Sequence, residues 1–444
     1  MNKGHRLLCA FILAVFLLPG CAAGERAIPD CLRFKQHMKV THLGMNRDQY
    51  VVTPETVQPR VNEEISAVVE ELRAEAEPYL AEKGAPTSFA DRLDAGPTIT
   101  RVGDRWMSFL SIARVTHGGN QVFAASDARV YNMETGERVY LEDILTETGW
   151  EYLEGKVRTG LEAHFPDLQP DRQALENLCG QSSLSARGFT LSPGHMSLHF
   201  HSHELYPDAP EGLIRVDISY TDLKPYMTET ALTETDCSGY QLVALTYDDG
   251  PSPASEGLIN QLRLYGAQAT FFIVGSMIAK VPSVLHREYD AGYSVQSHNW
   301  LHEYEDITPE KVAEWAETMD REMSGIIGIA PTLMRAPGGN EMTFIRAGSK
   351  LPQIHWTRSS GDAGKPSEND ILRIGGMVAG AHDGDIVLCH DLRSSALEYA
   401  AFYLPRLEKR NVLLVTVQDL CSLRGITPEE GMFLIGCPPA ETAE

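Results

Sequence analysis

Carboxylates and imidazoles recur directly after short apolar runs in the C-terminal half of this chain. Asp248 and Asp249 follow one such run, His298 and His302 follow another, and His390 ends a third. Two imidazoles and one carboxylate suit zinc, cobalt, nickel or iron better than calcium or magnesium, and they leave coordination sites open. The other aspartate would then be free to accept a proton, and a histidine opposite could donate one to a leaving group. This set predicts a hydrolytic site for an acyl group.

The apolar runs themselves predict the elements that position these residues. Seven candidate strands alternate with helical stretches, and they cover residues 242–247, 269–274, 293–297, 333–335, 354–357, 385–389 and 412–417. Alternating strands and helices predict an α/β fold with a parallel sheet and external helices. Seven strands fit a closed, slightly short (β/α) barrel, with an open doubly wound sheet as the alternative. Catalytic groups of such barrels lie just past the C-terminal ends of the strands, where these residues are found.

Each feature has a plainer explanation when it is taken alone. Paired aspartates such as Asp248 and Asp249 often form a solvated turn. Taken alone, Arg335 would be explained as a salt-bridge partner and His390 as a packed histidine at the end of a strand. The spacing of His298 and His302 also arises by chance, although it would place both rings on one face if the stretch were a helical turn. Their common order along one predicted rim argues against coincidence.

This ordered set resembles the polysaccharide deacetylases of carbohydrate esterase family 4, which have the NodB-type fold. The resemblance spans about residues 240–420 and rests on the stretches TYDDGP, HNWLH, RAPGG, SSGDA and LCHD. It implies a distorted, TIM-like (β/α)7 barrel. It also implies that Asp248 is the general base and that Asp249, His298 and His302 bind a divalent metal, preferably zinc, with cobalt or nickel as alternatives.

The resemblance implies roles for further residues around this centre. Arg335 would pair with Asp248, and the N–H of Gly338, which stands where many members have tyrosine, would face the oxyanion. His390 would be the general acid, tuned by Asp362. The remaining residues with implied roles at the substrate are Leu388, which would line the pocket for the acetyl methyl group, and Tyr247, which replaces a usual phenylalanine.

The fifth strand's motif departs from the family pattern. It usually reads Asp-x-x-Asp-Trp, whereas residues 359–363 of this chain read SSGDA, so the aromatic wall for the sugar is missing there. Trp300 or Trp356 would have to supply a ring instead, and the alternative is that both belong to the core. Asn299, which replaces Ser or Thr between the histidines, can still form a hydrogen bond.

The region before the predicted barrel has the pattern of an α+β module. Apolar residues recur every three to four positions from Val61 to Leu72, which predicts a helix, and residues 129–131 and 138–140 flank a turn that predicts a hairpin. The stretches 131–145 and 199–223 resemble the RsiV-like extracytoplasmic domain. We therefore divide the chain into residues 56–230 for this domain, 238–425 for the NodB-type domain, and 426–444 as a C-terminal tail. Three alternating histidines, His199, His201 and His203, suggest either a polar strand face or a metal site.

The first residues have the pattern of an export signal. Basic residues precede an apolar run over residues 7–18, which is shorter than the roughly 20 residues that span a bilayer. The run ends in Leu18-Pro19-Gly20-Cys21, which resembles a bacterial lipobox and predicts residues 1–20 as a lipoprotein signal, Cys21 as the lipidation site and residues 21–55 as a tether. Ordinary cleavage near Ala22 is the alternative. Both predict a protein that works outside the cytoplasm, where Cys421 and Cys437 could pair.

The net negative charge of the chain argues against two classes of binding partner. Acidic residues outnumber basic ones by 61 to 38, which argues against binding to nucleic acid and against a polybasic membrane anchor. Contact with a membrane is therefore expected only through the lipid anchor. The sequence favours a metal-dependent N-deacetylase of a cell-envelope glycan, with peptidoglycan preferred. The alternatives are an O-deacetylase of another acetylated polysaccharide and a non-catalytic glycan-binding or sensor lipoprotein.

Overall fold

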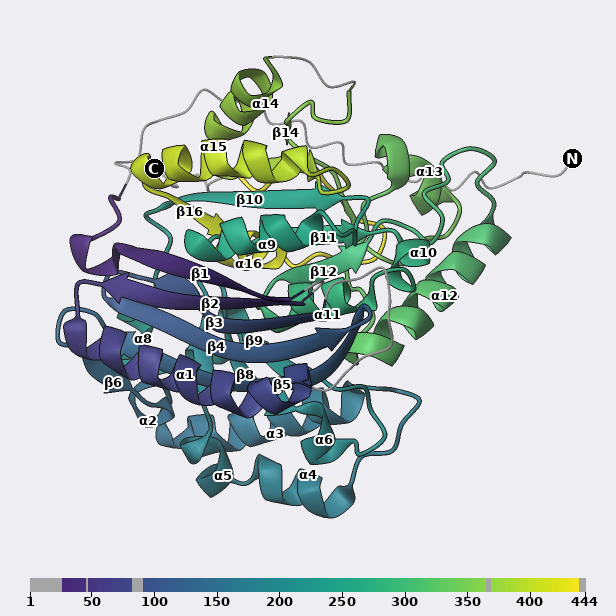
Figure 1. The fold of residues 1–444 in the computed structure, drawn as a ribbon. Helices are drawn as coiled ribbons and strands as arrows, with labels where there is room; N and C mark the ends of the chain where they lie inside the picture. Colours follow the sequence, from purple (N-terminus) through teal and green to yellow (C-terminus); the bar gives the residue numbers. More distant parts are fainter. Residues whose placement is uncertain (1–25, 45–46, 82–90, 365–368, 439–444) are drawn as a thin grey trace, which may run out of the picture.

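A six-stranded sheet organises the N-terminal half of the chain. The computed structural model describes residues 26–44, 47–81, 91–364 and 369–438 (Figure 1). In sheet order the strands are β1 (Phe34–Gly44), β2 (Arg47–Thr56), β3 (Asp91–Val102), β4 (Trp106–His117), β5 (Asn120–Asn132) and β6 (Glu137–Val139). Neighbours are antiparallel except β2 and β3, which run parallel. The helix α1 (Pro59–Ala81) connects these two and packs its apolar face, predicted from Val61 to Leu72, on the sheet.

A second layer of helices and a small sheet completes this half. The antiparallel strands are β7 (Phe189–Leu191), β8 (His195–His201) and β9 (Leu213–Ser219). The helices are α2 (Leu141–Ile144), α3 (Glu147–Ala163), α4 (Arg172–Cys179), α5 (Gln181–Ala186), α6 (Ser202–Leu205), α7 (Tyr220–Leu223) and α8 (Glu229–Glu234). Trp106 on β4, Leu153 on α3 and Leu198 on β8 belong to one buried apolar cluster. The predicted hairpin of residues 129–131 and 138–140 is confirmed, since β5 and β6 pair there.

Residues 34–56 are not a tether. They form β1 and β2, which pair as a hairpin at the edge of the six-stranded sheet. The prediction was wrong because most side chains on this edge hairpin are exposed or half-buried, so the sequence carries no apolar alternation. Residues 1–25, with the predicted signal and Cys21, lie outside the described residues. Within the described ranges, no helix has both the length and the apolar character needed to cross a membrane.

The C-terminal half is a mixed α/β arrangement of parallel strands with external helices, as predicted. The strands are β10 (Gln241–Asp248), β11 (Thr270–Ile273), β12 (Ser294–Ser297), β13 (Gln353–Ile354), β14 (Arg358–Ser359), β15 (Ile386–His390) and β16 (Val412–Val415). The hydrogen-bonded order is β12-β11-β10-β15-β14, with β16 also on β10. The strand expected at residues 333–335 is reduced to Met334, which bridges Ser297 of β12 and Gln353 of β13. Parallel pairing places the carboxyl ends of these strands on one side.

The helices around these strands come between them in the chain. They are α9 (Ser255–Leu264), α10 (Gly275–Ile278), α11 (Pro282–Asp290), α12 (Pro309–Ile327), α13 (Glu341–Arg346), α14 (Asp370–Ala379), α15 (Ser395–Lys409) and α16 (Val417–Leu423). At the start of α12, Pro309 lies in the first turn and the Thr308 hydroxyl accepts a hydrogen bond from the Lys311 N–H. The predicted tail contains β17 (Phe433–Leu434), which pairs with β13.

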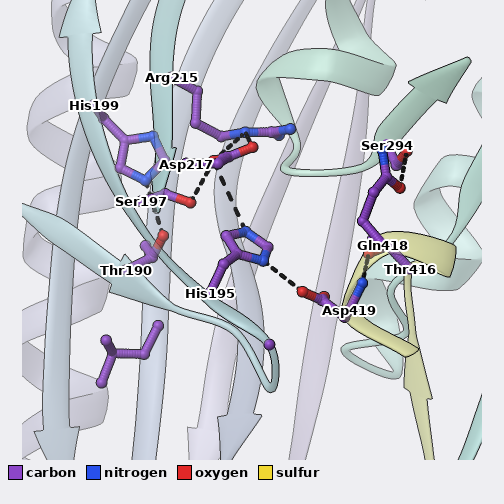
Figure 2. A network of polar contacts seen from close by, with 12 residues as sticks. Thr190, His195, Ser197, His199, Arg215, Asp217, Ser294, Thr416, Gln418 and Asp419 are labelled. Atoms are coloured by element: carbon purple, nitrogen blue, oxygen red, sulfur yellow. Dashed lines mark hydrogen bonds and ion pairs between the residues drawn. The ribbon is translucent and has the colours of Figure 1, made fainter. Parts of the chain in front are cut away.

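Buried ion pairs join the two halves. Asp94 on β3 lies 2.8 Å from Arg287 on α11 and 3.5 Å from Arg263 on α9, and all three side chains are buried. A second junction is formed by His195 on β8 and Asp419 on α16, 2.6 Å apart (Figure 2). Burial alone would raise the pKa of Asp94, but the neighbouring guanidinium groups outweigh it and hold this pKa well below its usual range. Desolvated charges therefore join the N-terminal module to the outer helices, in addition to an apolar cluster that contains residues of both halves.

Replacing Asp94 by alanine is expected to lower the free energy of unfolding by about 3–5 kcal/mol, because buried arginines would be left without their counter-charge. Urea denaturation of the full chain measures this change. The matched control is Asp222→Ala, whose exposed pair with Lys156 should be worth at most about 1 kcal/mol. Equal small losses in both variants would show that the Asp94 cluster does not hold the halves together.

Candidate active site

The candidate base lies at the end of β10 and is held by a fully buried arginine. Asp248 is 2% exposed, and its Oδ1 accepts a hydrogen bond from Arg335 Nη1 at 2.8 Å. The guanidinium is itself fixed, because it also donates to the Thr246 hydroxyl and to the backbone carbonyls of Ile354 and His355. A charged hydrogen bond of this kind fixes the orientation of the carboxylate. The predicted pairing of Asp248 with Arg335 is present.

Asp249, His298 and His302 converge as a candidate metal centre. Asp249 Oδ1 lies 3.3 Å from His298 Nε2 and 3.1 Å from His302 Nε2. This oxygen is buried, yet it makes no hydrogen bond of acceptable geometry. An orphaned carboxylate oxygen facing two imidazole nitrogens fits a site for a cation of the zinc type. His298 Nδ1 lies 2.8 Å from the carbonyl of Arg335, which fixes the ring with Nε2 toward Asp249.

The two histidines do not share a helical turn. Residues 298–302 form a loop in which Asn299 and His302 have φ values of 66° and 53°. These left-handed conformations, rather than helical periodicity, bring the ring centroids to 5.1 Å. The helical reading of this spacing was therefore wrong, although the two imidazoles do face one acceptor.

The candidate acid lies at the end of β15, the strand beside β10, where His390 is in register with Asp248. His390 Nδ1 is 2.7 Å from Asp362 Oδ1, and the backbone N–H of His390 donates to the other carboxylate oxygen. Burial alone would lower the pKa of His390, but Asp362 and the two aspartates after β10 outweigh it and raise this pKa to about 9. Asp249, Asp362 and His390 line one pocket, together with Leu392 and Tyr399. Because Asp362 occupies Nδ1, Nε2 is the ring nitrogen that can serve a substrate.

Replacing Asp362 by asparagine is expected to move the alkaline limb of the pH–rate profile to lower pH by about one unit or more. The acid must carry its proton to act, and the Asp362 carboxylate raises the pKa of His390, so its loss narrows the range in which the imidazolium persists. The profile of kcat/KM against pH measures the shift. Asp385→Asn is the control, since Asp385 lies before β15 and bonds Arg358 instead. An unmoved alkaline limb in Asp362→Asn would contradict the assignment of His390.

The three residues predicted to contact the substrate differ in where the structure places them. Leu388 is on the same face of β15 as His390 and is nearly buried. Gly338, with φ 66°, is exposed in the turn after Arg335. Tyr247 was placed wrongly, because alternation along β10 points it away from Asp248. Its ring packs on Phe271 and its hydroxyl contacts that of Tyr403 under the outer helices.

Asp391 was not assigned a role from the sequence, although it directly follows His390. It is fully buried, its Oδ2 accepts a hydrogen bond from Ser255, and its backbone N–H donates to the Asp248 carbonyl. A Cβ on Gly250 would lie 2.5 Å from the same carboxylate, so only glycine lets the loop after β10 approach this closely. Burial raises the pKa of Asp391 to about 7, against the hydrogen bond from Ser255. The sequence did contain a signal for Asp391, because a polar residue just past the end of a strand lies where such folds place their functional groups.

The histidines of the N-terminal module do not form a three-imidazole face. His199 is buried and lies 2.9 Å from the Thr190 hydroxyl (Figure 2). His201 and His203 contact the carboxylate of Glu211 instead, at 2.8 Å and 3.2 Å. These three groups are close enough to hold an ion, but the contacts are also those of ordinary ion pairs.

Comparison with known proteins agrees with the geometry. The family model for polysaccharide deacetylase matches residues 235–351. A peptidoglycan-N-acetylglucosamine deacetylase of Bacillus cereus is 30% identical over 189 residues, which make up 40% of this chain and 88% of that protein. The chain belongs to the polysaccharide deacetylase family. Peptidoglycan-N-acetylglucosamine deacetylase PgdA of Listeria monocytogenes is 30% identical over 182 residues, and the match covers 40% of this chain and 38% of that protein.

Solved structures of deacetylases are also similar to part of this chain. Peptidoglycan deacetylase PdaC from Bacillus subtilis is 30% identical, and the match covers 42% of this chain and 92% of that structure with a TM-score of 0.37. A T48 deacetylase with substrate is 26% identical, with coverage of 45% and 98% and a TM-score of 0.41. The matched segments make up less than half of this chain, and the N-terminal half adds its own module.

Proposed function

We propose that this polysaccharide deacetylase is a metal-dependent hydrolase that removes N-acetyl groups from N-acetylhexosamine residues of a cell-envelope glycan, with peptidoglycan as the preferred substrate. The observation that carries the proposal is the buried, orphaned Oδ1 of Asp249 between the Nε2 atoms of His298 and His302. Asp248, which pairs with Arg335, and His390, which pairs with Asp362, stand in register on the neighbouring strands β10 and β15. This is the arrangement required for hydrolysis of an amide.

Asp249, His298 and His302 would hold a divalent ion, which we expect to be zinc, with cobalt or nickel as alternatives. When bound, the ion would act as a Lewis acid on the amide carbonyl and on water. The donor set of two imidazoles and one carboxylate is that of catalytic rather than structural zinc sites, since it leaves open positions.

The protein's own groups would move the protons. Asp248 would accept a proton from the attacking water while Arg335 keeps it in place. The N–H of Gly338 would face the oxyanion of the tetrahedral intermediate. His390, oriented by Asp362, would give its proton to the departing amine nitrogen as the C–N bond breaks. Leu388 would line the space for the acetyl methyl group. The products are acetate and a free amine on the sugar.

We also propose that the parallel strands form a distorted (β/α)7 barrel rather than an open doubly wound sheet. Pairing runs from β15 through β10, β11 and β12 to Met334 and β13. The chain then passes directly from β13 to β14, which pairs with β15 again. A ring of this kind brings the ends of β10, β12 and β15 to one mouth.

The names of the relatives and the start of the sequence support an envelope substrate. PgdA, PdaC and the Bacillus cereus relative are all described as peptidoglycan deacetylases. Residues 1–21 have the pattern of a lipoprotein signal with Cys21 as the anchor, which would place the enzyme on the outer face of the cytoplasmic membrane. The similarity of residues 56–230 to the RsiV-like domain remains a prediction that fits the same location.

Release of acetate by the purified chain, loaded with zinc or cobalt, tests the proposed function. N-acetylglucosamine oligomers and peptidoglycan should release acetate and gain free amines. Release of acetate from acetylated xylan, but not from the other glycans, would favour the O-deacetylase. This alternative is supported by a bifunctional xylanase/deacetylase that is 26% identical over 200 residues. Tight binding of a glycan without any acetate release would overturn the enzyme proposal in favour of a sensor or glycan-binding lipoprotein.

A further inference from the structure

Two cysteines close an excursion of the chain near its C-terminal end. Cys421 lies on α16 and Cys437 lies shortly after β17, and their sulfur atoms are 3.5 Å apart. Both side chains are buried in an apolar cluster that also contains Ile354 and Ile386. A disulfide requires about 2 Å between its sulfur atoms, so each atom would have to move by less than ~1 Å. The structure therefore brings together the two thiols that the sequence suggested could pair.

The segment between these cysteines makes few contacts of its own. Within residues 425–436 no residue is fully buried, and Ile426 and Leu434 pack only partly against the core. The strand in this segment, β17, pairs with β13 over two residue pairs, and the N–H groups of Gln353 and His355 donate to carbonyls of the segment. Few buried contacts favour local opening of the segment, which a covalent bond between its two ends would limit.

The backbone that this segment covers also holds the arginine beside the candidate base. Arg335 donates from Nε to the carbonyl of Ile354 at 3.0 Å and from Nη2 to that of His355 at 3.1 Å. The N–H of His355 in turn donates to the Leu434 carbonyl of β17 at 2.7 Å. The backbone paired with β17 thus orients the guanidinium that bonds Asp248. We expect loosening of the segment to reach the candidate base through this chain of hydrogen bonds.

We propose that Cys421 and Cys437 form a disulfide when the chain reaches an oxidising compartment, and that this bond fixes β17 on β13, the strand that helps to hold Arg335. The bond would close a loop between cysteines 16 positions apart, and it would stabilise the fold mainly by restricting the unfolded chain. Disulfides persist outside the cytoplasm and are rare inside it. The effect on activity rests on the proposed function, whereas formation of the bond is measured without it.

Formation of the bond is a two-step exchange with an oxidising disulfide. The thiolate of one cysteine attacks a sulfur atom of the reagent, which forms a mixed disulfide and releases one thiol. The thiolate of the second cysteine then attacks the sulfur of the first, which forms the Cys421–Cys437 bond and releases the other thiol. The two cysteines lose two protons and two electrons, and the reagent gains them. Because both sulfur atoms are buried in the folded chain, we expect the exchange to precede docking of the segment and the finished bond to resist reduction.

Peptide mapping of the full chain tests whether the bond forms. The chain is folded with oxidised glutathione as the oxidising disulfide, then unfolded without reductant, alkylated and digested. The digest should contain a linked pair of peptides with Cys421 and Cys437, lighter by two hydrogen atoms than the two free peptides together. Alkylation of both cysteines, or linkage of either one to another cysteine, would overturn the proposal.

Hydrogen exchange and thermal unfolding measure what the bond does. Reduction of the wild-type chain by a phosphine should speed exchange in the peptide that contains Gln353 and His355 by about tenfold or more, and it should lower the melting temperature by about 3–6 °C. Cys421→Ala, Cys437→Ala and the double variant should lose nearly the same stability, because removal of either sulfur breaks the same bond. Losses that add in the double variant would show two independently packed thiols and contradict the proposal. The matched control is Cys179→Ala, a buried cysteine of α4, which should leave the response to reductant unchanged.

Activity separates failure of this inference from failure of the proposed function. In the reduced chain and in the double alanine variant, kcat for acetate release should fall by about threefold or more with KM little changed, since Arg335 orients the base rather than the substrate. An equal kcat in the oxidised and reduced chains would refute the support of the base by the bond and leave the deacetylase intact. A mapped bond that slows exchange in a chain that releases no acetate would refute the deacetylase and support the bond.

Discussion

The Asp248→Asn enzyme is expected to lose about 10²- to 10⁴-fold in kcat/KM for acetate release, the range for removal of a general base. The exchange conserves shape, and the asparagine oxygen can still accept the hydrogen bond that Arg335 donates at 2.8 Å. The fold and the candidate metal ligands should therefore remain in place. The loss should be in kcat, because the base acts in the transition state rather than in binding.

Metal content distinguishes the base from a ligand in this experiment. The Asp248→Asn chain should retain the ion of the wild-type chain, as measured by mass spectrometry after dialysis. Its thermal unfolding should occur at a lower temperature, since the buried Arg335 loses its counter-charge, but the chain should remain folded because Arg335 keeps its carbonyl partners. Acetate release at the wild-type rate would refute the assignment of Asp248 as the base, and loss of the ion would make it a ligand instead.

Replacing the neighbouring Asp249 by alanine should give the opposite pattern, in which the ion and the activity are lost together. The carboxylate is the charged member of the candidate set, and its Oδ1 faces both imidazoles. Mutation of a residue that only supports a metal ligand lowers metal affinity by about 10- to 100-fold. Loss of the ligand itself should lower the affinity by more than that. Titration with cobalt, followed by its absorption spectrum, measures the affinity in both variants.

The cluster at Glu211 supplies the control for metal content. His201, His203 and Glu211 are the second described group that is close enough to hold an ion. Glu211→Gln should therefore leave activity and the ion at Asp249 unchanged. An ion that persists in Asp249→Ala but is lost in Glu211→Gln would place the metal in the N-terminal module and contradict the account.

The sequence predicted the parts of the site that lie at strand ends. Alternating strands and helices place the ends of parallel strands on one side, so Asp248, His298 and His390 were expected to meet. The pairing of Asp248 with Arg335 and of His390 with Asp362 was implied by the family resemblance, and both pairs are present. The resemblance also implied a role for Tyr247 at the substrate, but strand alternation turns a residue next to an inward-facing aspartate outward.

Other features had no signal in the apolar pattern. The loop at residues 298–302 depends on positive φ values at Asn299 and His302, which spacing does not encode. The hairpin β1–β2 lies at a sheet edge, where both faces meet solvent. The ion pairs between the two halves join Asp94 to distant arginines, and these residues meet only through the tertiary fold.

The most direct test of the central claim is a metal titration of the chelator-treated full chain, with acetate release from an N-acetylglucosamine oligomer as the readout. The account predicts negligible release from the metal-free protein and a rise that is complete at one equivalent of zinc or cobalt bound to Asp249, His298 and His302. Full activity without metal, or saturation that survives the loss of these three residues, would contradict it.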